Sequence, residues 1–167
     1  MEFTLKEKLM LATKYQKYSD NYDHPNKFNG ESLVILPDND IAFKMAQLFT
    51  VKAQTKVYYL LKDSISSFYS DEIIQNSIQY TYNDMNSLCI PRDIFIDKIR
   101  THDFENIIDL NANFSRFGAF LCLLSNSKVR MGFNYDNSKK YYNVILDSNY
   151  QQDLEGTFKM IQQFIKI

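Results

Sequence analysis

Short apolar runs that alternate with helix-like stretches are the feature that most constrains how this chain can fold. Residues 32–37 (SLVILP) and 106–110 (NIIDL) are continuous aliphatic runs, which are typical of strands buried on both faces. Strands that alternate with helices form βαβ units, and such units build a mostly parallel sheet with helices on both faces. With 167 residues the chain has room for one core of this kind. We therefore predict an α/β fold, a single Rossmann-like three-layer domain over residues 31–167, preceded by an extra N-terminal helix over residues 1–20.

The other elements follow from hydrophobic spacing and from turn-forming residues. Further strands are expected at residues 55–62, 77–83, 128–133 and 141–147, while residues 85–90 form either a short extra strand or an irregular connection. Helices are expected at residues 39–49, 63–74, 91–104, 115–124 and 149–167. Asn39 or Asp40 is placed to cap the first of these helices and Asp63 the second. Pro91 suits the first turn of the third, where no N–H is needed.

Residues 3–19 have the spacing of an amphipathic helix. Leu5, Leu9 and Ala12 form an apolar stripe, and lysines occupy the positions around it. We expect this stripe to dock on the domain. The alternative is peripheral contact with a membrane through the basic face, although Glu7 interrupts that face. The segment 20–30 is rich in turn formers and is expected to be a connection.

Charge, hydropathy and cysteine usage argue against several classes of protein. A formal net charge of −1 gives no electrostatic basis for binding nucleic acid. No run reaches the ~18 apolar residues of a membrane helix, and the charged N-terminus does not resemble a signal peptide. We therefore expect no transmembrane segment and a cytoplasmic location. Cys89 and Cys122 are far apart in apolar surroundings, and His24 and His102 are isolated. This pattern predicts two free core thiols, no metal and no cofactor.

A ligand is expected at the loops that follow the strands, because open parallel sheets bind ligands outside the carboxyl ends of their strands. Here those loops follow Leu36, Leu61, Leu110 and Phe133. The loop after Leu36 (PDND) precedes a helix N-terminus, which favours anions. However, it contains no glycine for close approach to a pyrophosphate, and Asp38 and Asp40 would repel one. The loop is therefore not predicted to bind a nucleotide.

Two aspartates lie at strand ends or helix starts where chemistry is feasible. Asp40 could accept a proton from a sugar hydroxyl as a general base, and the simpler alternative is that it or Asn39 caps the helix. Asp109 ends a buried strand and either orients a ligand or forms a hydrogen bond to the next turn. For both residues the structural role is the simpler interpretation.

Three basic residues follow Asp109 in the sequence. Arg116 lies in the next helix, and Lys128 and Arg130 flank the next strand. We expect that they either form a basic rim around an acidic sugar or glycan, which Asp38 and Asp109 would also contact, or belong to a solvated face. The solvated face is the simpler alternative.

Residues 106–133 resemble the acceptor-side, N-terminal half of glycosyltransferase family 9, the ADP-heptose:lipopolysaccharide heptosyltransferases. The matching residues are Ile108, Asp109 and Leu110 in a strand, Arg116 and Leu124-Ser125 in a helix, and Lys128, Arg130, Gly132 and Phe133 in the next strand. The resemblance implies that Asp40 falls where the family has its catalytic aspartate, with Asn39 in place of a glycine. The chain ends with a helix where the second Rossmann domain of the family, which binds the nucleotide sugar, would begin. The chain is equally similar to a short Bacteroidetes family that has no assigned activity.

Three hypotheses for function follow. The favoured one is a stand-alone, non-catalytic domain, derived from half of a glycosyltransferase, that binds a protein partner. The second is the acceptor-binding half of a split glycosyltransferase acting on a charged glycan or a lipid-linked sugar. In that case Asp40 would be the base, and Arg116, Lys128 or Arg130 would contact the acceptor. The third is a peripheral membrane or assembly protein that uses residues 3–19.

Overall fold

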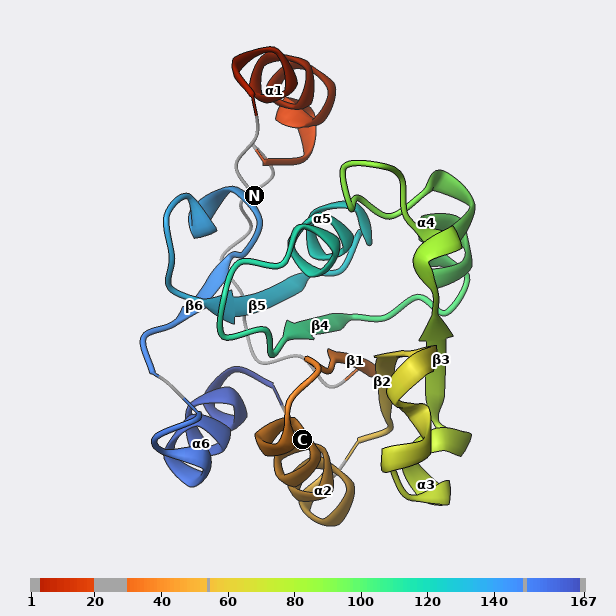
Figure 1. Cartoon of the computed structure of the whole chain (residues 1–167). Coiled ribbons are helices and arrows are strands. Elements are labelled where there is room, and N and C mark those ends of the chain that lie inside the picture. The colour runs from red at the N-terminus through yellow and green to blue at the C-terminus, as the bar shows by residue number, and fades with distance from the viewer. Residues whose placement is uncertain (1–3, 20–29, 54, 149, 166–167) are drawn as a thin grey trace.

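The computed structural model describes residues 4–19, 30–53, 55–148 and 150–165, which contain one sheet of six strands (Figure 1). The strands are β1 (Ser32–Ile35), β2 (Val57–Lys62), β3 (Ser77–Tyr80), β4 (Asn106–Asp109), β5 (Val129–Phe133) and β6 (Val144–Leu146). Their order is β3-β2-β1-β4-β5-β6, and every neighbouring pair is parallel. This is the strand order of the doubly wound Rossmann fold. The predicted Rossmann-like α/β fold is confirmed.

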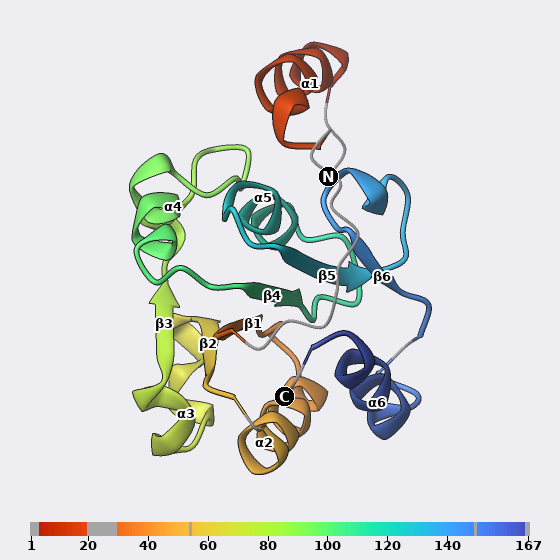
Figure 2. The ribbon, with the colours of Figure 1, turned by 180° about the vertical axis from the view of Figure 1, so that it is seen from behind.

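Helices cover both faces of the sheet. They are α1 (Leu5–Ser19), α2 (Asp40–Lys52), α3 (Asp71–Gln75), α4 (Asp93–Arg100), α5 (Arg116–Leu124) and α6 (Leu154–Phe164). Three short 3-10 segments are η1 (Asp63–Phe68), η2 (Tyr82–Asp84) and η3 (Ser138–Lys140). Figures 1 and 2 show α2, α3 and α6 on one face of the sheet and α4 and α5 on the other, with α1 beyond α5. The fold therefore has the three predicted layers.

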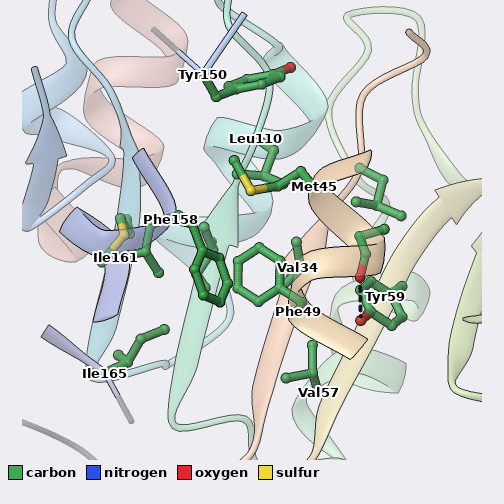
Figure 3. Close-up of a cluster of buried hydrophobic side chains, with 14 of the residues drawn as sticks. Val34, Met45, Phe49, Val57, Tyr59, Leu110, Tyr150, Phe158, Ile161 and Ile165 are labelled. Atoms are coloured by element: carbon green, nitrogen blue, oxygen red, sulfur yellow. Dashed lines mark hydrogen bonds between the residues drawn. The ribbon is translucent and has the colours of Figure 1, made fainter. Parts of the chain in front are cut away.

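Two hydrophobic cores flank the sheet because successive residues of a strand point to opposite faces. In β1, Val34 joins the core beneath α2 and α6, whereas Leu33 and Ile35 join the core beneath α4 and α5. Figure 3 shows the first core, where the rings of Phe49 and Phe158 meet edge to face with their centroids 5.1 Å apart. Because both faces of the central strands are buried, their sequences are continuous aliphatic runs.

Helix α1 docks on α5 through a different face from the one predicted. Leu11 and Tyr15 are buried, and the ring of Tyr15 meets the ring of Phe120 in α5 with their centroids 5.1 Å apart. The stripe that starts at Leu5 and Leu9 is exposed instead, so the predicted docking face was wrong. The residues that dock are a leucine and a tyrosine four apart, and a count of aliphatic residues misses the aromatic contact. The predicted connection at residues 20–30 lies, apart from Gly30, outside the described residues.

The predicted helix over residues 63–74 is divided into η1 and α3. Asp63 is the first residue of η1 and its side chain caps no helix, so that prediction was wrong. The hydroxyl of Ser66 donates a hydrogen bond to the Asp63 carbonyl oxygen at 2.8 Å, and Tyr69 then adopts extended backbone angles. Serine side chains compete for backbone groups in this way, which favours a tight turn over a continued α-helix.

Residues 85–91 form an irregular connection, one of the two predicted alternatives. Met85 and Pro91 make a single isolated antiparallel bridge, so Pro91 precedes α4 instead of lying in its first turn as predicted. Cys89, which was expected in the core, is exposed in this connection and has a φ of 58°. Cys122 is buried in α5 as expected.

Candidate functional site

The candidate site is the carboxyl edge of β1 and β4, which is the switch point of the sheet. These strands are neighbours, with Ile35 opposite Asp109. The chain leaves β1 towards α2 on one face of the sheet and leaves β4 towards α5 on the other (Figure 1). The two loops therefore diverge, and ligands of doubly wound sheets bind where this happens. Three of the predicted site residues belong to this switch point: Asp109 ends β4, Asp38 lies in the loop after β1, and Asp40 begins α2.

Asp109 is held in a closed hydrogen-bond network. Its side chain is buried, and the hydroxyl of Tyr142 donates to Oδ2 at 2.7 Å. The backbone N–H and the side-chain amide of Asn111 donate to Oδ1 at 2.9 and 2.6 Å. Tyr135 in turn donates to the Tyr142 hydroxyl at 2.6 Å. Burial raises the pKa of Asp109 from 3.8 to about 6, against the opposing effect of the hydrogen bonds from Asn111 and Tyr142. This arrangement supports the simpler interpretation, a structural hydrogen bond to the turn that follows β4.

Two glycines make room for this network. An added Cβ on Gly118 of α5 would lie 2.8 Å from Cγ of Asp109, and one on Gly132 of β5 would lie 2.7 Å from Cδ2 of Tyr142. Both distances are too short for carbon atoms, so neither position accepts a side chain unless the network moves. Sequence analysis identified Asp109 but missed Tyr142, because the contact joins strand β4 to residues 33 positions later.

Asn39 caps α2. Its side-chain oxygen accepts a hydrogen bond from the Ala42 N–H at 3.0 Å, and its amide donates to the Tyr150 hydroxyl at 3.2 Å. Of the two predicted alternatives the cap is therefore Asn39, and Asp40 is the exposed first residue of the helix. Among the described residues, the carboxylate of Asp40 has no hydrogen bond or ion pair.

The three predicted basic residues do not all begin at the carboxyl edge of the sheet. Arg116 begins α5 at the carboxyl edge, as expected. Lys128 precedes β5 and pairs with Glu105 at 2.7 Å, and Arg130 is the second residue of the same strand. Both residues lie towards the amino edge of the sheet, because the chain enters β5 there and β5 runs parallel to β4. Lys128 is therefore separated from Arg116 along the sheet, and the grouping of Arg116, Lys128 and Arg130 around one ligand stays a prediction.

Tyrosines that sequence analysis missed lie around the loop after β1. Tyr80 ends β3, and its ring stacks on Phe117 with the centroids 4.2 Å apart. Burial raises the pKa of Tyr80 to about 12, with smaller contributions from the negative charges of Asp109 and Asp38. Tyr150 accepts the hydrogen bond from Asn39 described above. No spacing rule points to these two residues, because one ends β3 and the other lies in the connection between β6 and α6.

Neither a metal-binding cluster nor a membrane-spanning helix is present in the part of the chain that the structure describes. There, no group of three or more His, Cys, Asp and Glu side chains is arranged to hold a metal ion. His102 stacks on Phe104, and His24 lies outside the described residues. No described helix has both the length and the apolar character needed to cross a membrane.

The fold defines a Rossmann-like α/β domain with three aspartates at its switch point. Comparison of the chain with protein-family models, with curated proteins and with solved structures finds no match. The resemblance to glycosyltransferase family 9 and to the short Bacteroidetes family therefore stays a prediction.

Proposed function

We propose that this chain is a non-catalytic binding domain that binds a protein partner through the outer face of α1. The observation that carries the proposal is the exposure of three large apolar side chains on one short helix. Leu5 is 76%, Leu9 63% and Met10 53% exposed, although α1 is already docked on the domain. Single exposed apolar residues are normal on protein surfaces, whereas several on one helix are typical of an interaction site.

The charges on α1 indicate the chemistry of the partner. Lys6 and Lys8 are exposed beside the apolar residues. Glu7 is half-buried, and its carboxylate accepts hydrogen bonds from the N–H and hydroxyl of Thr4 at 2.7 and 2.9 Å. Among the described residues, the outward charge of the helix is therefore positive. A partner with an apolar groove and an acidic border would complement this face.

The switch point at β1 and β4 supports a non-catalytic role. The buried carboxylate of Asp109 already accepts three hydrogen bonds from Tyr142 and Asn111, which occupies both of its oxygens. The loop after β1 has no glycine to let a phosphate approach the backbone. Neither feature favours turnover of a nucleotide-linked substrate.

The outer face of α1 is tested by the double variant Leu5→Ser, Leu9→Ser. We expect the tagged wild-type chain to recover a partner from native lysate and the variant to lose at least about 90% of it, because two apolar anchors worth about 1.5–3 kcal/mol each are removed. The partner is identified by mass spectrometry, purified, and its affinity for both chains is measured by calorimetry.

A matched control is the double variant Val51→Ser, Ile94→Ser. These side chains are 81% and 85% exposed and lie on α2 and α4, away from α1. We expect this variant to bind the purified partner as the wild type does. Equal binding by all three chains, or binding of the wild type only to vesicles of anionic lipid, would contradict the proposal.

A second candidate is the acceptor-binding half of a split glycosyltransferase. It is favoured by the exposed carboxylate of Asp40, which remains available because Asn39 caps α2. If the chain is recovered together with a nucleotide-sugar-binding protein, we expect sugar transfer by the reconstituted complex to fall about 10²–10⁴-fold in Asp40→Asn, the usual contribution of a general base. Transfer that survives this change would remove Asp40 from the reaction, and Asp71→Asn on α3 is the control for the loss of an exposed charge.

A further inference from the structure

A chain of hydrogen bonds connects the buried carboxyl group of Asp109 to the loop that follows β5. The hydroxyl of Tyr142 donates to Oδ2 of Asp109 at 2.7 Å, and the hydroxyl of Tyr135 donates to the hydroxyl oxygen of Tyr142 at 2.6 Å. Tyr135 is half-buried and helps to line an open cavity of about 620 Å³ that residues 134–140 form. The chain of hydrogen bonds therefore leads from a buried acid to the wall of a cavity.

Packing holds the two tyrosine rings in place. The ring of Tyr135 lies between Phe114 and Tyr142, with centroid distances of 5.1 and 5.8 Å. Tyr142 is 1% exposed, and its backbone N–H donates to the carbonyl oxygen of Ser138 at 3.0 Å, which ties the ring to the cavity loop. The hydroxyl hydrogens can rotate about their C–O bonds, whereas the oxygen atoms of the chain stay at hydrogen-bonding distance from one another.

The two carboxyl oxygens of Asp109 differ in how they can take up a proton. Oδ1 accepts two hydrogen bonds from Asn111, at 2.9 and 2.6 Å, so a proton on Oδ1 would meet two donors. Oδ2 accepts the hydrogen bond of a hydroxyl, and a hydroxyl can accept as well as donate. A proton on Oδ2 is therefore accommodated when Tyr142 turns its hydrogen towards Tyr135, which in turn directs its own hydrogen away from Tyr142.

Asp109 is the member of this cluster that changes its charge between neutral and acidic pH. Burial raises its pKa from 3.8 to about 6. The other titratable groups that act on it or on its partners are Tyr135, Tyr142, Cys122 of α5, Tyr80 of β3 and Tyr150 before α6. Burial raises the pKa of each of them, so all five keep their protons in this range. The charge of Arg130, in β5, acts on Cys122. His102 precedes β4 and therefore lies at the opposite, amino edge of the sheet.

We propose that Asp109, Tyr142 and Tyr135 form a proton-operated switch that sets the hydrogen-bonding character of the cavity wall. While Asp109 is ionised, both tyrosine hydroxyls donate inwards, and the Tyr135 oxygen can accept a hydrogen bond from outside the chain. A proton that enters from water at Tyr135 moves each hydroxyl hydrogen one step inwards. Asp109 is then protonated on Oδ2, both tyrosines remain neutral, and Tyr135 has become a donor at the cavity. The switch requires neither α1 nor a protein partner.

The switch is tested by NMR of the full chain, labelled with ¹³C at Cζ of tyrosine and at Cγ of aspartate, between pH 4.5 and pH 7.5. We expect the Cζ resonances of Tyr135 and Tyr142 to shift with the same midpoint as Cγ of Asp109, near pH 6. In Tyr142→Phe the chain of hydrogen bonds is broken. Asp109 should then still titrate, while Tyr135 loses most of its shift.

Asp109→Asn imitates the protonated carboxyl group. Its carbonyl oxygen can accept the hydrogen bonds from Asn111, which places the amide N–H groups where Oδ2 was, as donors to Tyr142. We expect Tyr135 in this variant to stay at its low-pH position at every pH. The matched control is Tyr141→Phe, which removes the hydroxyl of the neighbouring tyrosine, whose ring packs on Phe114 outside the chain of hydrogen bonds. It should titrate as the wild type does.

Three outcomes would overturn the proposal. The first is a wild-type Tyr135 that does not follow the midpoint of Asp109. The second is a Tyr135 in Asp109→Asn that stays at its high-pH position or still shifts with pH. The third is a full shift of Tyr135 in Tyr142→Phe. If Tyr142→Phe does not fold, the first two outcomes still decide.

Discussion

Replacing Gly118 with alanine is expected to lower the free energy of unfolding by roughly 3 kcal/mol or more. The new methyl group would lie 2.8 Å from Cγ of Asp109, and Asp109 cannot move aside because it is buried and bound by Asn111 and Tyr142. The chain must then either shift α5 away from the sheet or break these hydrogen bonds. Overpacking of a core costs about 1–3 kcal/mol, and a buried polar group that loses its partner adds about as much. Urea denaturation followed by circular dichroism measures the loss.

Gly156→Ala is a closely matched control. Gly118 and Gly156 are both the third residue of a helix, and the N–H of each bonds to the side chain of the N-cap residue, Ser115 or Asp153. The added methyl group at position 156 would also meet a carboxylate, that of Asp153, but this side chain is exposed and can rotate away. We expect a change within about 1 kcal/mol, since the weakened cap is offset by the higher helix propensity of alanine. A similar loss in both variants would show that Asp109 does not restrict position 118.

The strands of the sheet were predictable because the signal for each strand lies within its own short run of residues. The run at residues 32–37 contains residues for both cores, and β1 buries all four of its residues. The alternation of such runs with helical stretches leads directly to parallel βαβ units. The strand order itself was not predicted, because it depends on which strands pair over long distances. Once that order is known, the site must lie between β1 and β4, where the chain reverses direction across the sheet.

The site was predictable only in part, because it also depends on contacts between residues that are far apart in the sequence. Asp109 and Arg116 were placed at the carboxyl edge correctly, because they directly follow or end a strand. Lys128 and Arg130 were grouped with them by their proximity in sequence, although the strand direction puts them towards the other edge. Tyr142 and Tyr150 were missed because they meet Asp109 and Asn39 only in three dimensions. In a Rossmann-like fold, the position of a residue along its strand is thus a better guide to the site than its charge.

The two faces of α1 illustrate a second limit of prediction from sequence. The spacing of Leu5 and Leu9 correctly indicated an amphipathic helix, and α1 does form. What spacing does not show is which apolar face docks within the chain and which remains exposed. The ring contact between Tyr15 and Phe120 explains the choice in this case. An apolar stripe predicted to be core can therefore be the exposed face instead.

Asp109→Asn is expected to remove most of the pH dependence of stability between pH 4 and pH 7. In the folded chain the pKa of Asp109 is raised by burial from 3.8 to about 6. Between these two values the folded state binds more protons than the unfolded state, so the wild type loses stability as the pH rises. A difference of about two pKa units corresponds to roughly 3 kcal/mol, which is lost in full above pH 6. Wild type should therefore be more stable near pH 4.5 than near pH 7.5, and asparagine, which has no charge to bury, should stay nearly constant.

Urea denaturation at pH 4.5, 5.5, 6.5 and 7.5 measures this slope. Asparagine at position 109 can still accept the hydrogen bonds from Asn111 through its carbonyl oxygen, so the variant should fold. The matched control is Asp40→Asn, which changes an exposed aspartate at the same switch point and should keep the slope of the wild type. Glu7 acts in the opposite direction, because the hydrogen bonds from Thr4 lower its pKa. The stability that Glu7 contributes to the folded chain is therefore lost only as the pH falls below 4.5. Two outcomes would contradict a raised pKa of Asp109 in the folded chain. One is a slope that persists in Asp109→Asn, and the other is a wild type that gains stability from pH 4.5 to 7.5.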